Sequence, residues 1–165
     1  MAKKHIVVMG VSASGKTTFG EALAARRSMD CVDGDSLHSK EEIAKMKSGE
    51  ALTDEERAPW LDRVGAVLAD EKTYPNGVIV PCSALKLAYR DRLRDLDPEV
   101  GFIYLRVDRA LVVERFKGRK GHFMPAELID SQFETLEPPT AAETDVLILD
   151  GDRPIEDLVT EALDW

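Results

Sequence analysis

The sequence contains few cysteines and few aromatic residues, and it lacks any long hydrophobic run. Its two cysteines, Cys31 and Cys82, lie far apart in apolar segments, so a disulfide framework is not expected and a reducing compartment is favoured. No stretch approaches the length of a membrane span. The apolar run after Lys3 and Lys4 is too short for a signal peptide and has no cleavage-type segment behind it. We therefore expect a cytoplasmic protein that does not bind membranes.

An excess of positive charge is also missing. The formal net charge is −9, which argues against a general binder of nucleic acids or membrane surfaces. Basic residues nevertheless gather between positions 106 and 120, namely Arg106, Arg109, Arg115, Lys117, Arg119 and Lys120. Such a cluster in an acidic protein either holds a small anion or forms a solvated helix face, and charge alone does not separate the two.

Internal repeats and low-complexity segments are absent as well. The chain of 165 residues is of the size of one domain, and it is long enough to bury about 70% of its extended surface. A hydrophobic content of 44% with 32% charged residues is ordinary for a globular protein. We therefore treat residues 1–165 as a single domain.

The strongest motif that is present is the segment from Gly10 to Thr17, GVSASGKT, which fits the phosphate-loop pattern G-x-x-x-x-G-K-S/T. An apolar strand is expected before it at residues 6–9, and a helix behind it at residues 17–27. In that setting backbone N–H groups surround an anion at a helix N-terminus. Lys16 would reach the β- and γ-phosphates, and the Thr17 hydroxyl would bind Mg²⁺. The alternative is a glycine-rich turn that merely joins a strand to a helix.

Two carboxylates follow the next predicted strand, at residues 31–35. Alternation along a strand would place Asp33 and Asp35 on the same side, with Gly34 between them. Carboxylates at this position after a phosphate loop suit Mg²⁺ binding and proton transfer, although turn formation or helix capping would use the same residues. His38 follows three residues later, and its role stays open.

The rest of the chain alternates between helix and strand signals. Helices are expected at residues 40–50, 53–71, 84–96, 109–116, 125–136 and in the last segment from Ile155, with Thr53, Ser83 and Asp108 as N-caps and Pro59 as the position of a kink. Strands are expected at residues 78–82, 100–107 and 145–150. Residues 117–124 form a basic loop in which glycines flank the cations. We interpret this loop as a mobile lid.

Strands interleaved with helices in this way predict an α/β fold, with a five-stranded parallel sheet and helices on both faces. Ligands of such sheets collect at the carboxyl ends of the strands. The phosphate loop, the Asp33/Asp35 pair, the Ser83 turn and the basic loop should therefore surround one cleft.

These parts suit phosphoryl transfer, which needs positioning and charge neutralisation more than covalent chemistry. An aspartate can orient an acceptor hydroxyl and take its proton, and a closing basic loop can exclude water. The spacing of Arg115 and Arg119 would let one guanidinium cover the adenine while the other reaches the phosphates. The residues thus indicate a small-molecule kinase. A nucleotide switch that binds partners is the rival, but the N/T-K-x-D guanine motif is missing.

The chain resembles the gluconate kinases (gluconokinases), in the shikimate-kinase-like group of P-loop kinases. The resemblance covers nearly the whole chain, and its more specific motifs are residues 82–86 (CSALK) and 119–125 (RKGHFMP). Further matches are the phosphate loop, Asp33-Gly34-Asp35 with Leu37-His38, Lys45-Met46, Gly49, residues 52–55, Arg57, Pro59-Trp60-Leu61, Tyr89-Arg90, Ser131-Gln132-Phe133 and Leu136-Glu137.

This resemblance implies a P-loop kinase fold and transfer of the ATP γ-phosphate to the 6-hydroxyl of D-gluconate. It implies Lys16, Asp35 and Arg119 as catalytic residues, and Thr17 and Asp33 near Mg²⁺. ATP would be bound by Gly10, Val11, Ser12, Ala13, Ser14, Gly15, Lys16, Thr17, Thr18, Arg115 and Arg119. Substrate would be bound by Asp35, His38, Arg57, Ser83, Lys86, Arg90, Lys120 and His122. Another metabolite kinase, of the shikimate or adenylylsulfate type, is the alternative within the same class.

The chain departs from the family pattern at Ala13, where many relatives have glycine, and it lacks a longer loop that some relatives carry before the second strand. Neither departure removes a charged or nucleophilic group, so altered affinity is the expected consequence. Family members are often homodimers, and the resemblance therefore also suggests a homodimer.

Overall fold

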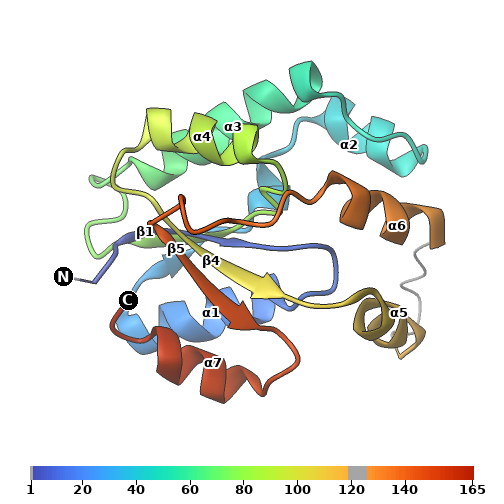
Figure 1. Ribbon diagram of the computed structural model, residues 1–165. Coiled ribbons are helices and arrows are strands. Elements are labelled where there is room, and N and C mark those ends of the chain that lie inside the picture. The colour runs from blue at the N-terminus through green and yellow to red at the C-terminus, as the bar shows by residue number, and fades with distance from the viewer. Residues whose placement is uncertain (1, 119–125) are drawn as a thin grey trace.

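A computed structural model describes residues 2–118 and 126–165. Within these residues a sheet of five strands, all parallel, has the order β2-β3-β1-β4-β5. Figure 1 shows α3 and α4 on one face of the sheet and α1 and α7 on the other, with α5 and α6 beyond the carboxyl ends of the strands. The predicted α/β fold with helices on both faces is confirmed.

The elements follow the expected alternation. The strands are β1 (His5–Met9), β2 (Asp30–Cys31), β3 (Val78–Pro81), β4 (Gly101–Arg106) and β5 (Val146–Asp150). The helices are α1 (Lys16–Arg27), the 3₁₀ helix η1 (Gly34–Leu37), α2 (Lys40–Lys47), α3 (Asp54–Leu68), α4 (Leu87–Leu96), α5 (Arg109–Lys117), α6 (Ala126–Thr135) and α7 (Ile155–Ala162).

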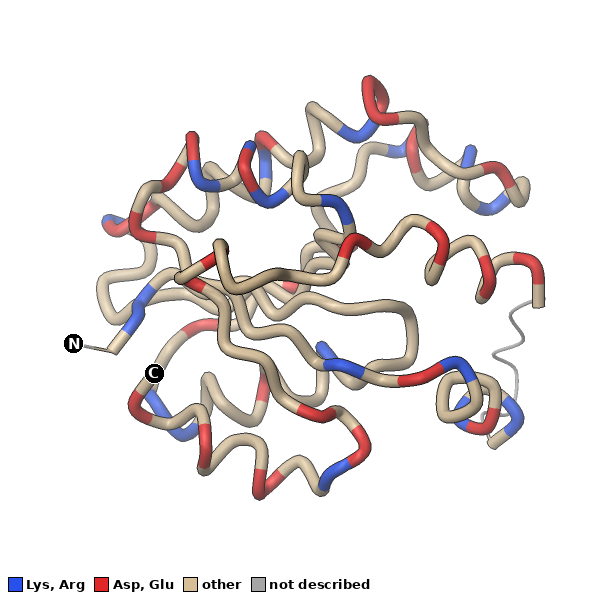
Figure 2. Tube along the Cα trace, viewed as in Figure 1, with Lys and Arg blue, Asp and Glu red and all other residues tan. Residues whose placement is uncertain are grey.

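Alternate residues of the central strands face two separate cores. In β1, Val7 and Met9 pack with Trp60 and Val64 of α3, whereas Ile6 and Val8 face α1 and α7. All four strand residues are fully buried, which explains the uninterrupted apolar sequence of a strand that is covered on both faces. Figure 2 shows the consequence, since Lys, Arg, Asp and Glu follow the helices and the strand ends while the middle of the sheet carries other residues.

A third, smaller apolar cluster lies beyond the carboxyl ends of the strands. It joins Val11 of the phosphate loop and Leu85 to Val112 of α5 and Ile129 of α6. Because these residues lie beyond the carboxyl ends of the strands, in loops and in α5 and α6, the cluster ties the two helices to the region where the nucleotide is expected.

Several helix starts agree with the sequence. Thr53 caps α3 in a capping box with Glu56, and the Asp108 side chain accepts a hydrogen bond from Leu111 N–H at the start of α5. A second capping box joins Ser39 and Glu42 at the start of α2. Pro59 lies inside α3.

Two local predictions are wrong. The second strand ends at Cys31, so strand alternation does not place Asp33 and Asp35; they lie instead at the start of η1, where the Asp33 carboxylate accepts a hydrogen bond from Asp35 N–H at 2.9 Å. Ser83 does not cap the next helix, because α4 begins at Leu87 with Lys86 at its N-cap.

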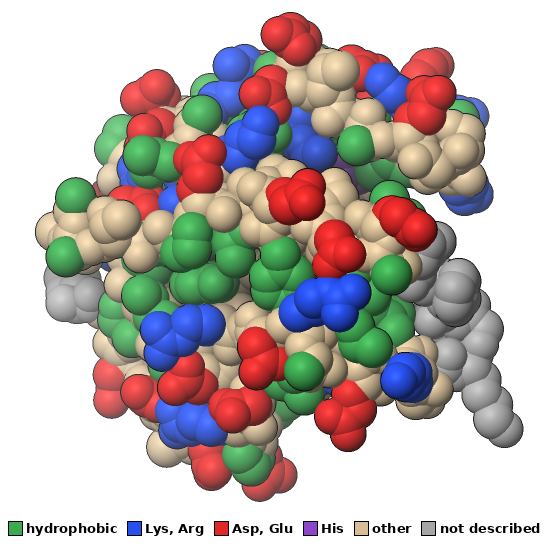
Figure 3. Space-filling model, turned by 45° about the vertical axis from the view of Figure 1, so that its right-hand side comes forward, with side chains coloured by type: hydrophobic (Ala, Val, Ile, Leu, Met, Phe, Trp, Pro, Cys, Tyr) green, Lys and Arg blue, Asp and Glu red, His purple; other side chains and the backbone are tan. Residues whose placement is uncertain are grey.

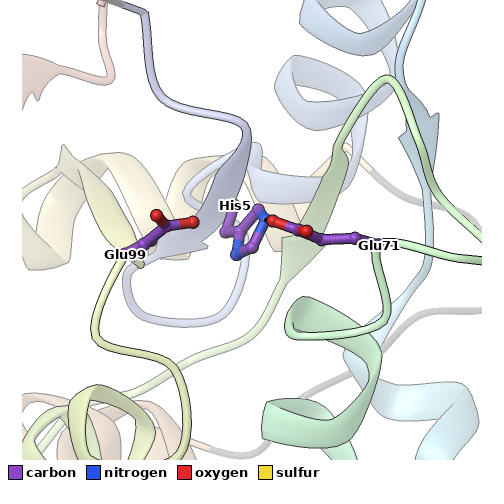
Figure 4. A group of neighbouring side chains, drawn as sticks. All are labelled: His5, Glu71 and Glu99. Atoms are coloured by element: carbon purple, nitrogen blue, oxygen red, sulfur yellow. Dashed lines mark ion pairs between the residues drawn. The ribbon is translucent and has the colours of Figure 1, made fainter.

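The amino end of the sheet carries a buried polar pair. His5 at the start of β1 shares a 2.6 Å hydrogen bond with the Asp97 carboxylate, and both residues are about 95% buried. Figure 4 shows the His5 ring between the carboxylates of Glu71 and Glu99, and Glu71 lies 3.4 Å from His5 Nε2. The chain termini meet near this end, where Lys3 N–H donates to the Trp165 carbonyl.

Among the described residues, no helix is both long and apolar enough to cross a membrane. Acidic and basic side chains are interspersed over the face seen in Figure 3.

Candidate active site

The phosphate loop joins β1 to α1, and its path depends on Gly10. The φ angle of Gly10 is +149°, and a Cβ atom there would lie 2.8 Å from Ser14 Oγ and 2.9 Å from the Leu105 carbonyl oxygen. Ala13 also has a positive φ, +62°, in the left-handed region where a non-glycine residue costs about 1–2 kcal/mol. The alanine that departs from the family pattern therefore sits in a conformation that favours glycine.

Polar groups of the loop face inward. Ser14 is almost fully buried, and its Oγ has no hydrogen-bond partner among the described residues. Lys16 is partly buried, and its Nζ donates to the Val11 carbonyl at 2.9 Å. Thr17 and Thr18 lie exposed in the first turn of α1, whose N-terminal N–H groups favour an anion.

Burial lowers the pKa of Lys16 from 10.5 to about 8, and the negative charges of Asp35 and Asp33 offset only part of this effect. Two conclusions follow from the shift. The carboxylates lie close enough to Lys16 to act on its charge, as the cleft prediction requires. A phosphate group beside Lys16 would supply further negative charge and would stabilise its protonated form.

The loop is held from the side of α6 and α5. Gln132 Oε1 accepts hydrogen bonds from Ser12 N–H at 3.2 Å and from Ser12 Oγ at 3.3 Å. Arg115 donates to the carbonyls of Ala13 at 2.7 Å and Gly151 at 2.6 Å. Arg115 therefore lies against the phosphate loop, and its predicted contact with ATP stays a prediction. The contact of Gln132 was not predicted, although Gln132 stood in a matched motif.

A cavity of about 380 Å³ lies at the carboxyl ends of β4 and β5, and it is lined by Arg106, Val107, Asp108, Leu111, Asp150 and Asp152. Gly151 joins this region to the phosphate loop, because a Cβ atom on it would lie 3.3 Å from the Ser14 carbonyl and 2.7 Å from Val107. Gly151, whose carbonyl accepts a hydrogen bond from Arg115, therefore lies beside both this cavity and the phosphate loop.

The turn from Asp33 to Asp35 is held in place by contacts with β3 and α3. A Cβ atom on Gly34 would lie 2.6 Å from the Pro81 carbonyl, so only glycine allows this close approach of η1 to β3. Trp60 Nε1 donates to the Gly34 carbonyl at 2.7 Å, and the His38 ring stacks on Trp60 at 4.4 Å with an interplanar angle of 12°. Trp60 belongs to the core beneath the sheet, and its bond to the Gly34 carbonyl also holds the turn that carries the two carboxylates.

His38 is held in one orientation by Glu42. Its Nδ1 lies 3.0 Å from Glu42 Oε1, and Arg63 binds both oxygens of the same carboxylate at 2.8 and 2.6 Å. Burial disfavours the Glu42 charge, but hydrogen bonds from His38, Ser39 and Arg63 outweigh it and hold the pKa of Glu42 at about 2. An ionised Glu42 only accepts hydrogen bonds, so His38 donates to it from Nδ1–H.

The remaining predicted residues divide into two groups. Arg57, Lys86 and the Asp33–Asp35 turn share the carboxyl end of the sheet, and the Ser83 carbonyl accepts a hydrogen bond from Gly10 N–H at 3.2 Å. Arg119, Lys120, His122 and most of the predicted lid lie outside the described residues.

Arg90 is the exception, because the hydrogen-bond donors of its side chain are already engaged within the protein. Its Nε and Nη2 bind Glu143, Nη2 also donates to the Glu137 carbonyl, and Nη1 donates to the carbonyls of Ala84 and Leu85. These bonds engage all five guanidinium donors, and Arg90 is 1% exposed. The structure therefore does not bring Arg90 to the site.

A phosphate loop on a parallel sheet of order 2-3-1-4-5, with carboxylates beside its lysine, defines a P-loop kinase. A family model described as an AAA domain matches residues 6–139. The thermoresistant gluconokinase of Escherichia coli K12 is 45% identical over 97% of this chain and 92% of its own length. The chain belongs to the gluconokinase family, and it is an ATP-dependent carbohydrate kinase.

Solved structures agree. A gluconokinase from Sinorhizobium meliloti superposes with a TM-score of 0.89 at 42% identity, covering 99% of this chain and 91% of that one. Shikimate kinase from Aquifex aeolicus has a TM-score of 0.59 at 20% identity, covering 96% and 92% of the two chains, and it supports the fold alone. The predicted family and fold are both confirmed. ATP binding with a divalent metal follows from the family.

Proposed function

We propose that the protein transfers the γ-phosphoryl group of ATP to the 6-hydroxyl of D-gluconate at this site. The observation that carries the proposal is that Lys16 of the phosphate loop lies near enough to Asp35, at the carboxyl end of the sheet, for the Asp35 charge to raise the pKa of Lys16 against the effect of burial. The names of the relatives supply the acceptor, because curated gluconokinases match almost the whole chain.

The phosphate loop would bind the β- and γ-phosphates through its N–H groups, the N-terminus of α1 and Lys16. Oxygen ligands suit Mg²⁺, and the exposed Thr17 hydroxyl and the Asp33 carboxylate offer them beside Lys16. When bound there, Mg²⁺ neutralises charge on the phosphates. The buried Ser14 Oγ is a further polar group that the loop itself leaves without a hydrogen bond.

Asp35 is exposed at the start of η1 and would take the proton of the acceptor hydroxyl. The hydroxyl oxygen then forms a bond to the γ-phosphorus while the bond from the γ-phosphorus to the β–γ bridging oxygen breaks, and ADP leaves. Lys16 stabilises the negative charge that develops on the transferred group. His38, Ser83, Arg57 and Lys86 are the described residues that we propose for gluconate, with Arg90 removed from the predicted set.

The test is an ADP-release assay over a panel of acceptors, with gluconate, shikimate, adenylylsulfate and nucleoside monophosphates. We expect ADP release that depends on gluconate and on Mg²⁺, with 6-phosphogluconate identified as the product. Omission of the acceptor and chelation of the metal are the controls. ADP release with another member of the panel, and none with gluconate, would refute the proposal.

The predicted cytoplasmic location and homodimer also stay proposals. Light scattering coupled to size-exclusion chromatography measures the mass in solution, and a mass near 18.3 kDa would exclude the dimer.

A further inference from the structure

Several backbone N–H groups of the phosphate loop have no hydrogen-bond partner among residues 2–118 and 126–165, namely those of Ala13, Gly15 and Lys16. The N–H groups of such a loop cradle the phosphates of a nucleotide. These three are therefore groups that the loop offers to a phosphate. Their directions depend on the φ and ψ angles of the loop, and so on the contacts that hold the loop in shape.

Other N–H groups of the loop are bound within the protein, and one of them differs from the rest. The N–H groups of Gly10 and Ser14 donate to backbone carbonyls, each at 3.2 Å. The Ser12 N–H group donates instead to a side chain, at 3.2 Å from Gln132 Oε1. In the described part of the chain, Gln132 therefore supplies the one side-chain acceptor for a backbone N–H group of the loop.

The packing of α6 brings Gln132 to the loop. Ile129, three residues earlier on that helix, is buried in the apolar cluster that also contains Val11 of the loop. Residues three apart lie on the same side of a helix, so the packing that buries Ile129 also turns Gln132 towards the loop. Gln132 Oε1 accepts from both donors of Ser12, the N–H group and the hydroxyl at 3.3 Å.

The residue after Ser12 is the one in a costly conformation. Ala13 has a φ angle of +62°, and a strained residue of this kind persists only where its surroundings hold it. The bond from Ser12 to Gln132 holds the loop before Ala13, and the bond from Arg115 to the Ala13 carbonyl, at 2.7 Å, holds it after that residue. Loss of the first bond would let Ala13 return to a negative φ, which turns its N–H group away from the phosphate.

We propose that Gln132 is a positioning residue, which holds the phosphate loop in its phosphate-binding conformation by keeping Ala13 in the left-handed region. A neutral side chain suits this role, because an amide oxygen accepts both hydrogen bonds without placing a negative charge beside the phosphates. The inference concerns the nucleotide side of the reaction, so it does not depend on which acceptor receives the phosphoryl group.

The experiment measures the dissociation constants of Mg²⁺–ADP, by calorimetry, and of AMP, by competition, with no acceptor present. ADP carries a β-phosphate for the loop, and AMP lacks it. Gln132→Ala should raise the ADP constant about tenfold, which corresponds to about 1.4 kcal/mol, and change the AMP constant less than about threefold. Gln132→Met keeps the length of the side chain and loses the acceptor, so it should give the same result while filling the space beside α6.

A double-mutant cycle with Ala13→Gly tests whether Gln132 acts through Ala13. Glycine adopts a positive φ at little cost, so the loop of this variant needs less support. In the Ala13→Gly background, Gln132→Ala should weaken ADP binding less than about threefold, against about tenfold in the wild-type background.

The matched control is Glu134→Ala, which truncates an exposed side chain of the same helix. We expect this control to leave both dissociation constants unchanged, and melting curves show that each variant is folded at the temperature of the titration. An ADP constant within about twofold of the wild type in both Gln132→Ala and Gln132→Met would overturn the proposal. Equal losses for ADP and AMP would also overturn it, as would an equal loss in the control.

Equal losses of ADP binding in the two backgrounds would overturn the route through Ala13. The outcome stays separate from that of the proposed function, because the titrations contain no acceptor. A wild-type protein that releases no ADP with gluconate would refute the proposed function and leave the role of Gln132 to be judged by these constants.

Discussion

The two ends of the sheet treat buried polar groups differently. At the amino end, His5 and Asp97 are both buried and bind each other, with Glu71 beside them. At the carboxyl end, Ser14 Oγ and Arg57 Nε are buried and have no hydrogen-bond partner within the described chain. Both ends contain polar side chains inside an apolar fold, yet among the described residues the buried side-chain atoms without a hydrogen-bond partner lie at the carboxyl end alone.

This difference distinguishes buried polar groups that stabilise the fold from buried polar groups that are available to a ligand. A satisfied pair such as His5–Asp97 stabilises the connections around β1 and leaves no donor to offer. An unsatisfied donor destabilises the protein by itself, so it persists where a ligand completes its hydrogen bonds. The same contrast holds between two arginines. All five donors of Arg90 bind the protein, whereas Arg57 Nε has no hydrogen-bond partner among the described residues.

The largest effect is expected from a substitution at the carboxyl end of the sheet. Lys16→Ala should lower kcat by roughly 10³-fold, because it removes a donor that stabilises charge on the transferred phosphoryl group. The fold should remain intact, since the lost bond to the Val11 carbonyl is a single contact of a partly buried side chain. Steady-state kinetics beside circular dichroism check both statements. A turnover number within tenfold of the wild type would contradict the role of Lys16.

Asp35→Asn should have the next largest effect. Asparagine keeps the shape and can still accept a hydrogen bond, but it does not take a proton. We expect gluconate phosphorylation to slow at least about 100-fold, with ATP–Mg²⁺ binding nearly normal. A loose transition state needs little early deprotonation, so the effect can lie at the low end of that range. A nucleotide titration and a product assay on one preparation give the comparison, and near-normal product formation would remove Asp35 from the mechanism.

Much of the fold was predictable, because it depends on local signals. The phosphate-loop motif, the apolar strands and the capping residues Thr53 and Asp108 each act over a few residues. The wrong boundary at the second strand has a tertiary cause. Gly34 passes within contact of the Pro81 carbonyl and bends the chain into η1, and a sequence pattern carries no sign of that neighbour.

The candidate site was predictable only in part. Lys16, Thr17 and Asp35 follow from motifs, and Arg57 and Lys86 followed from resemblance. Asp54 lay in the matched segment 52–55 and Tyr89 in the matched pair Tyr89-Arg90, but neither had an assigned role. Their contact joins the first turns of α3 and α4, 35 residues apart, so it depends on how two helices pack and not on any local spacing.

A smaller effect is expected at the amino end, where a satisfied pair can be broken. Asp97→Ala leaves His5 Nδ1 buried without its partner, which should lower the free energy of unfolding by about 1–3 kcal/mol. The gluconate and ATP constants should not change, because this end lies opposite the phosphate loop. Denaturant titration and kinetics test the two statements together, with Asp97→Asn as the variant that retains an acceptor. Loss of activity without loss of stability would contradict the contrast between the two ends.

The smallest effect concerns Glu42, whose contacts with His38 and Arg63 lie at the carboxyl end yet are satisfied like those of the amino end. Its pKa in the folded protein is about 2, below the usual 4.5, so its ionised form stabilises the fold. That stabilisation is fully present above about pH 4.5 and is lost as the pH falls towards 2. Glu42→Gln does not titrate, so the difference in melting temperature between wild type and variant should shrink steadily over this range. Melting curves from pH 6 to pH 2 measure it, with Glu41→Gln as an exposed control on the same helix, and a constant difference would show that the Glu42 carboxylate gains nothing from its ionisation.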